Sequence, residues 1–241
     1  MRKYPVDLHT HTIISGHAYS TLLENIEECR EKGIEVYGVS DHAPSMPGGA
    51  PLFYFGNLKT IPRIIKGVTV LKGAEGNIIN YNGNIDLPMR IQKSIDYMII
   101  SFHDVCISPG TIEENTKAVL KAMDNPYVTI LGHCGNPVFP LNYEAVVKKA
   151  KEKDIIIEIN NSSLGGSRVG SLDNCTKVAE LCKKYGTKVI LGSDSHFCTT
   201  IGEFEKCEEV LNKVLFPGKL IMNTYDKIIN YLKNKGKLHD L

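Results

Sequence analysis

Short hydrophobic runs alternate along the chain with longer segments in which hydrophobic residues recur every three or four positions. The short runs are rich in β-branched residues and predict seven strands, at residues 4–9, 34–40, 69–74, 95–101, 128–132, 155–160 and 188–192. The longer segments predict amphipathic helices, at residues 115–123, 143–153, 174–185, 204–214 and 225–235. This alternation indicates an α/β protein with a parallel sheet.

Two helix starts carry the spacing of a capping box. Thr21 precedes Glu24 by three residues, and Gly33 follows as a stop signal. Thr111 and Glu114 repeat the same spacing. We therefore expect helices to begin just after both threonines.

Two connections depart from this rhythm. The segment 43–57 is rich in proline and glycine, which predicts a loop. Segment 78–85 is divided by Asn82-Gly83, a strong signal for a hairpin turn.

Seven strand–helix units favour a sheet that closes into a single-domain barrel over residues 1–241. The alternative is a doubly wound open sheet. No G-x-G-x-x-G motif follows the first strand, which weakens the dinucleotide-binding form of that alternative.

The composition of the chain argues against nucleic acid and membranes as binding partners. The 241 residues include 28 Lys and Arg against 27 Asp and Glu, a net charge of +1, so there is no basic surplus for nucleic acid. No apolar run approaches the ~20 residues that span a bilayer, and the N-terminus lacks the apolar run of a secretory signal. We expect a cytoplasmic protein without a membrane partner. A homo-oligomer is neither favoured nor excluded.

The seven cysteines predict no disulfide framework. They are odd in number, dispersed and without a C-x-x-C pair, and they lie at positions 29, 106, 134, 175, 182, 198 and 207. Reduced thiols that mostly fill the core are the simplest interpretation.

The positions of the histidines indicate where a functional site would lie. Seven of the eight lie at or just beyond the C-terminal ends of predicted strands, and only His239 does not. Glu75 and Asp194 lie at two such ends, whereas Lys and Arg are absent from these positions. In a parallel barrel all strand C-termini open onto one face, where active sites are built. The candidate ligands are His9, His11, His17, His42, Glu75, His103, His133, Asp194 and His196.

Neutral imidazoles and carboxylates are typical ligands of zinc, manganese and iron. Nine ligands are too many for one ion, so they predict two ions, or three if Glu75 and Asp194 bridge. A covalent mechanism is less favoured. Cys134 lies beside His133 but has no recognisable nucleophile setting, and Ser193 and Ser195 lack a G-x-S-x-G elbow.

The ordered motifs DLHTHT, GVSDHA, LKGAEGN, SFHD, GHCGNP, EINNSS and LGSDSH resemble the PHP (polymerase and histidinol phosphatase) superfamily, and within it the single-domain YcdX-like phosphatases. The resemblance covers essentially the whole chain. It implies a distorted, TIM-like (β/α)7 barrel with a trinuclear metal centre.

Carried over by position, the resemblance implies three ligand sets. They are His9, His11, Glu75 and Asp194 for the first ion, Glu75, His103 and His133 for the second, and His17, His42 and His196 for the third.

The expected reaction is hydrolysis of a small phosphate monoester by a metal-activated hydroxide, with zinc favoured and manganese or iron as alternatives. Asp194 and Glu75 are the candidate catalytic carboxylates. Asp194 could accept a proton from the attacking water, but a carboxylate that also binds a metal is a weak base.

Arg168 is a candidate phosphate clamp, because its planar guanidinium suits phosphate. The alternative is an ordinary exposed arginine. For the 43–57 loop we consider two roles, either a cover that stacks Tyr54 and Phe55 on the substrate or a structural loop on the barrel rim.

Other functions remain as alternatives. An amidohydrolase-type metallohydrolase uses similar ligands but has no use for a third cluster, which here comprises His17, His42 and His196. A phosphodiesterase or nuclease of the PHP type is disfavoured by the near-neutral charge. A non-catalytic metal-binding protein is disfavoured by the absence of a thiolate cage.

Overall fold

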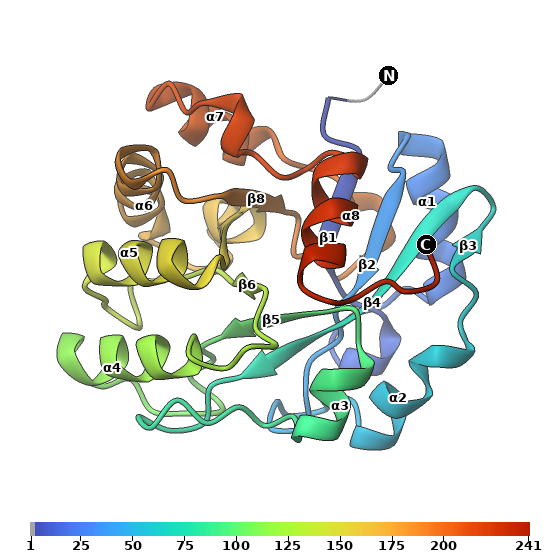
Figure 1. Cartoon of the computed structure of the whole chain (residues 1–241), viewed down its shortest axis with the longest axis horizontal. Helices are drawn as coiled ribbons and strands as arrows, with labels where there is room; N and C mark the ends of the chain where they lie inside the picture. The colour runs from blue at the N-terminus through green and yellow to red at the C-terminus, as the bar shows by residue number, and fades with distance from the viewer. Residues whose placement is uncertain (1–2) are drawn as a thin grey trace.

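The computed structural model describes residues 3–241 and contains a barrel of parallel strands surrounded by helices (Figure 1). Seven parallel strands are neighbours in the order β1, β2, β4, β5, β6, β7 and β8. Their bounds are β1 Val6–Thr10, β2 Val36–Val39, β4 Val68–Asn77, β5 Tyr97–Ser101, β6 Ile130–Leu131, β7 Ile156–Asn160 and β8 Val189–Gly192. Each overlaps one of the seven predicted strands.

The two end strands meet and nearly close the barrel. A parallel bridge joins Thr10, at the end of β1, to Ser195, just after β8. The backbone N–H of Asp194 donates to the carbonyl of His9 at 2.9 Å, and the N–H of His11 donates to the carbonyl of Ser195 at 2.8 Å. The predicted single-domain barrel is therefore confirmed over the open sheet as the fold class.

The outer helices follow the strands as expected. Their bounds are α1 Leu22–Lys32, α4 Ile112–Ala122, α5 Tyr143–Lys153, α6 Ser171–Tyr185, α7 Glu205–Lys213 and α8 Tyr225–Asn234. Both capping boxes are present. The Thr21 side chain accepts from Glu24 N at 3.3 Å while Glu24 Oε2 accepts from Thr21 N at 2.7 Å, and Thr111 and Glu114 do the same.

Three short elements were not predicted. Helix α2 (Leu52–Asn57) ends the segment that we expected to be a loop, and α3 (Met89–Ser94) precedes β5. Strand β3 (Ile64–Ile65) pairs antiparallel with the start of β4. The predicted hairpin around Asn82-Gly83 is reduced to a single antiparallel bridge between Ile78 and Ile85, with Gly83 at a φ of 76°.

The core has two parts. The larger one lies between the barrel wall and the outer helices. The smaller one fills the barrel interior, where Leu8, Ile99 and Ile190 pack with Ile228 and Leu232 of α8. Helix α8 thus covers one end of the barrel, beside β1 (Figure 1), and leaves the opposite end, at the strand C-termini, for the site.

All seven cysteines lack a disulfide among residues 3–241, and five of them are buried. Burial raises the pKa of the Cys134 thiol well above its usual value, so this thiol is not an activated nucleophile. No helix within residues 3–241 combines the length and hydropathy needed to cross a bilayer.

Candidate metal centre

The barrel brings all nine candidate ligands to its C-terminal end. These residues lie in six of the strands or in the loops that follow them. His9 lies in β1, with His11 and His17 after it, and Glu75 lies in β4. The remaining five follow β2, β5, β6 and β8. All except His17, His103 and His196 are classed as buried. Residues up to 185 positions apart, such as His9 and Asp194, are thereby brought into contact.

One group of ligand atoms surrounds Glu75 Oε2 and Asp194 Oδ1. His9 Nε2 lies 3.3 Å from the Glu75 oxygen and 3.4 Å from the Asp194 oxygen. His11 Nε2 lies 3.5 and 3.3 Å from the same two atoms. His9 and His11 are two residues apart on an extended segment, so both rings reach the same space.

The other oxygen of Glu75 serves a second group. Glu75 Oε1 lies 2.9 Å from His133 Nε2 and 3.4 Å from His103 Nε2, and Ser101 Oγ donates to it at 2.7 Å. The two oxygens of this one carboxylate thus face two different sets of histidines, which is the arrangement that a bridging ligand needs.

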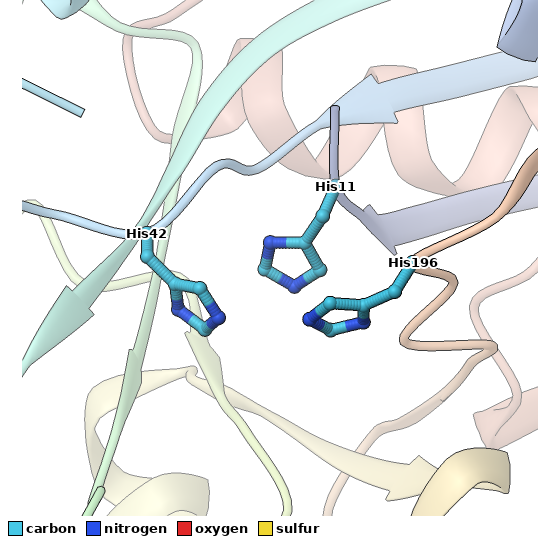
Figure 2. A group of neighbouring side chains, drawn as sticks. All are labelled: His11, His42 and His196. Carbon is cyan, nitrogen blue, oxygen red and sulfur yellow. The ribbon is translucent and has the colours of Figure 1, made fainter. Parts of the chain in front are cut away.

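The third group of rings lies beside the first. His17 has its ring centre 5.0 Å from that of His42 and 4.8 Å from that of His196. His11, His42 and His196 also have ligand nitrogens close enough to hold one ion together, and Figure 2 shows their three rings converging from different parts of the chain. His11 therefore lies against both the first and the third group. His42 also lies near Glu75, with Nδ1 2.8 Å from Oε2.

Unpaired polar atoms mark the same space. Within residues 3–241, six buried side-chain nitrogen or oxygen atoms have no hydrogen-bond partner, and five of them belong to the candidate ligands. These five are His9 Nε2, His11 Nε2, His42 Nδ1, Glu75 Oε2 and His103 Nε2. A buried polar atom without a partner costs about 1–3 kcal/mol, and bound cations would satisfy these five atoms. The residues therefore fit a metal centre.

The protonation states suit metal binding. Burial and the neighbouring His42 lower the pKa of His11 well below its usual value, and burial and Arg168 lower the pKa of His133 to about 4. Burial opposes ionisation of Glu75, but His42 and the other nearby histidines outweigh it and hold the pKa of this carboxyl well below its usual range. Neutral imidazoles and ionised carboxylates are the forms that bind metal.

The pKa values of His9 and Asp194 are shifted in opposite directions. Burial lowers the pKa of His9, but Glu158, Asp194 and Glu75 outweigh it and raise this pKa well above its usual value. Burial likewise opposes ionisation of Asp194, yet His9 and Arg168 hold its pKa well below the usual range. A cation bound here would take the place of the proton on His9.

Further buried groups orient the ligand rings. Ser15 Oγ lies 3.1 Å from His11 Nδ1 and donates to Asp41 Oδ1 at 2.7 Å. Asn77 Oδ1 accepts from His103 Nδ1 at 2.8 Å. Such partners set which ring nitrogen faces a metal. Asp41 is part of the GVSDHA motif, but no sequence pattern predicted this supporting role.

Arg168 lies at the centre rather than on an exposed loop. Its side chain is 17% exposed, and Nη1 donates to Asp194 Oδ2 at 2.9 Å and to Ser163 Oγ at 3.0 Å. It lines a cavity of about 1070 Å³ together with His17, His42, His103 and His196. The alternative of an ordinary exposed arginine is therefore wrong.

The 43–57 segment, which ends in α2, turns both of its candidate aromatic rings away from the cavity. Phe55 is buried in the outer core, and the Tyr54 hydroxyl donates to Asp41 Oδ2 at 2.6 Å, so neither ring lines the cavity. The stacking role considered for these two rings is wrong. From this segment the cavity wall includes Met46, whereas Tyr19, Val138, Val169 and Phe197 supply exposed apolar surface around it.

One buried acidic residue of the centre was missed. Glu158, in β7, is 2% exposed and faces His9 and His133. A single glutamate inside the otherwise apolar run 155–159 was the available signal, because a charged residue on a buried strand needs a partner inside the barrel.

Comparisons with known proteins agree with this geometry. The model of the PHP domain family matches residues 7–162. A probable phosphatase of Clostridium acetobutylicum is 60% identical over 237 residues, which cover 98% of this chain and 97% of the relative.

Solved structures share the fold. Histidinol phosphate phosphatase of Lactococcus lactis, crystallised with zinc, L-histidinol and phosphate, superposes with a TM-score of 0.59 and 15% identity over 88% of this chain and 94% of that one. A chain in the structure of archaeal ribonuclease P with mature tRNA superposes with a TM-score of 0.61 and 15% identity. The match covers 98% of this chain and 93% of that one. At such identities the likeness establishes the fold alone. The family model and the extensive identity to the clostridial relative show that this chain belongs to the PHP domain family.

Proposed function

We propose that this protein is a metal-dependent phosphatase that hydrolyses a small phosphate monoester with three divalent ions, zinc being the first choice. The observation that carries the proposal is the convergence of five unpaired buried ligand atoms beside a cavity that also holds an arginine. The name of the clostridial relative, a probable phosphatase, supports the same reaction class.

The proposed ligand sets follow the three groups of side chains. His9, His11, Glu75 and Asp194 would hold the first ion, and Glu75 would share the second with His103 and His133. His17, His42 and His196 would hold the third. The proximity of His11 to His42 and His196 supports a third ion close to the first. Bound ions of this kind lower the pKa of a water molecule and neutralise charge on phosphoryl oxygens.

Arg168 is proposed to bind the phosphoryl group. A guanidinium has five N–H donors, and two of them go to Asp194 and Ser163 through Nη1. The remaining donors, on Nε and Nη2, suit two oxygens of a phosphate. The contact with Asp194 holds the planar group in place at the cavity wall.

Asp194 and Glu75 are proposed as the catalytic carboxylates, with different tasks. Asp194 Oδ1 faces the histidines while Oδ2 faces Arg168 and Asn160. Because its pKa is held low, Asp194 is ionised and would act as a weak acceptor of a proton from an attacking water. Glu75 is fully buried between two groups of histidines, so its task is to hold the two groups together.

A substrate panel tests the proposal. Protein stripped of metal and reloaded with Zn²⁺ or Mn²⁺ is assayed with phosphomonoesters, phosphodiesters and cyclic amides, and its metal content is measured. We expect two to three ions per chain and hydrolysis of the monoesters. Hydrolysis of amides alone would instead establish an amidohydrolase, and hydrolysis of diesters alone a phosphodiesterase or nuclease. A metal content of zero or one ion would overturn the three-ion centre.

A further inference from the structure

Glu158 is a buried acidic residue with no assigned task. It lies in the middle of β7, where Ile156, Ile157 and Ile159 are buried apolar residues. A carboxylate in such a place is costly unless its oxygens accept several hydrogen bonds.

Both oxygens of Glu158 have partners in the metal centre. Oε1 lies 2.6 Å from His9 Nδ1. Oε2 accepts from the backbone N–H of His133 at 2.8 Å and from Asn160 Nδ2 at 3.1 Å. The carboxylate therefore contacts two candidate ligands, which come from β1 and from the end of β6.

The contact with His9 sets the roles of the two ring nitrogens. A carboxylate accepts hydrogen bonds, so it keeps the proton of His9 on Nδ1 and leaves the lone pair of a neutral ring on Nε2. That Nε2 is one of the unpaired buried atoms and lies 3.3 Å from Glu75 Oε2 and 3.4 Å from Asp194 Oδ1.

The contact with His133 acts on the backbone. His133 has a φ of 26°, a left-handed conformation that is unfavourable for a residue other than glycine. The hydrogen bond from its N–H to Glu158 stabilises this conformation, in which His133 Nε2 lies 2.9 Å from Glu75 Oε1.

The neighbouring strand leaves room for the carboxylate. A Cβ on Gly192, in β8, would lie 2.0 Å from Glu158 Oε1 and 3.0 Å from the Cβ of His9. Only glycine at this position allows Glu158 and His9 to meet. The position of the carboxylate is therefore determined by residues on three strands.

We propose that Glu158 is a positioning residue of the metal centre, which presents His9 through Nε2 and holds the backbone of His133. This inference rests on the metal centre of the proposed function. The positioning role differs from a purely structural role in a measurable way, because a positioning Glu158 requires the proton of His9 to lie on Nδ1 in the metal-loaded protein.

The substitution Glu158→Gln separates the two roles. The His133 N–H and the Asn160 amide donate, so the single oxygen of glutamine would face them. The glutamine NH2 would then face His9 Nδ1, which must become an acceptor and move its proton to Nε2. The size of the side chain and most of its packing are retained, but His9 Nε2 now carries the proton and cannot bind a metal.

The experiment compares wild type, Glu158→Gln and the control Asp96→Asn, all loaded with Zn²⁺. Asp96 is also buried and accepts a backbone hydrogen bond, from Lys72 N at 2.7 Å, but contacts no histidine. Zinc content and affinity are measured by chelator competition. The protons of ¹⁵N-labelled histidine rings are observed by NMR, and His9 is identified by comparison with His9→Gln.

We expect wild type to show a slowly exchanging Nδ1–H of His9, and Glu158→Gln to lose it and to bind zinc about 10–100-fold more weakly. Asp96→Asn should retain both properties. Equal zinc affinity and an unchanged His9 signal in Glu158→Gln would overturn the inference while leaving the metal centre intact.

Two further outcomes keep the inference testable. If Glu158→Gln does not fold, a wild-type His9 with its proton on Nε2 would overturn the inference, and one with its proton on Nδ1 would support it. Wild type that binds neither Zn²⁺ nor Mn²⁺ would overturn the proposed function itself, and this inference with it.

Discussion

At the scale of single residues, the centre depends on two carboxylates whose oxygens are divided between different neighbours. Glu75 faces His9, His11 and His42 with Oε2, and His103 and His133 with Oε1. The surrounding histidines hold the pKa of Glu75 low despite its burial. The side chains therefore provide the charge and the lone pairs that bound cations would need.

The substitution His42→Ala tests the third group of ligands. His42 lies near Glu75 and its ring stacks 4.3 Å from that of His11, so its loss affects neighbouring positions. We expect the loss of one ion per chain and a fall in kcat of more than about 100-fold. Metal analysis and steady-state kinetics measure this. His239→Ala, at the one histidine remote from the site, is the control. Full metal occupancy with unchanged kinetics would contradict the assignment of His42.

Arg168→Lys tests the phosphate clamp. Lysine keeps the charge but lacks the planar fork, so inhibition by inorganic phosphate should weaken about 10-fold, as expected for the loss of a charge-assisted hydrogen bond. The metal content should stay unchanged. The inhibition constant and KM are compared with those of Arg90→Lys, an exposed arginine on α3. An unchanged inhibition constant would show that Arg168 only supports Asp194.

At the scale of elements, local chemistry predicted the long helices and the strands well. The threonine–glutamate pairs at the starts of α1 and α4 form reciprocal caps, and these depend only on residues three positions apart. The short elements β3, α2 and α3 were not predicted. Each has two to six residues, too few for a recognisable hydrophobic period, and packing on the barrel wall stabilises them instead.

Thr21→Ala tests the cap of α1. The substitution removes the acceptor for Glu24 N, so the free energy of unfolding should fall by about 1 kcal/mol. Urea denaturation measures this, and metal content should not change. Thr224→Ala is the matched control, because Thr224 occupies the N-cap of α8 without a side-chain cap hydrogen bond. Equal destabilisation by the two substitutions would argue against the reciprocal cap.

At the scale of the whole molecule, the candidate ligands join six of the seven barrel strands. Glu158 lies in the remaining strand, β7, and contacts the centre as well. The centre also lies where β1 meets β8, through Asp194 and Ser195. Ions bound there would connect the first and last strands of the barrel. Metal binding and global stability should therefore be coupled.

Metal removal tests this coupling. Free Zn²⁺ at 100 times its Kd should stabilise the protein by about 2.7 kcal/mol per site. At about 2–4 °C per kcal/mol, chelation should lower Tm by roughly 5–10 °C for each site that is emptied. Thermal unfolding is followed before and after treatment with a chelator and after reloading. Zinc should restore Tm, whereas Mg²⁺, which prefers oxygen ligands, should not. The same Tm with and without chelator would show that the centre does not tie the barrel together.

The order of the main strands and helices, the two helix caps and the nine candidate ligands could be predicted from the sequence alone. Each of these is encoded locally, by hydrophobic period, by caps or by residue type at a strand end. The sequence also pointed to Arg168, because a guanidinium suits phosphate.

The contacts between these residues became known only from the folded structure. It buried Phe55 in the core, brought Arg168 to Asp194, divided the oxygens of Glu75 between two groups of histidines, and placed Glu158 between His9 and His133. These contacts join residues up to 149 positions apart in the case of Glu158 and His9. They depend on how neighbouring strands align, on the barrel closing at β1 and β8, and on the space left by Gly192, none of which a local pattern encodes.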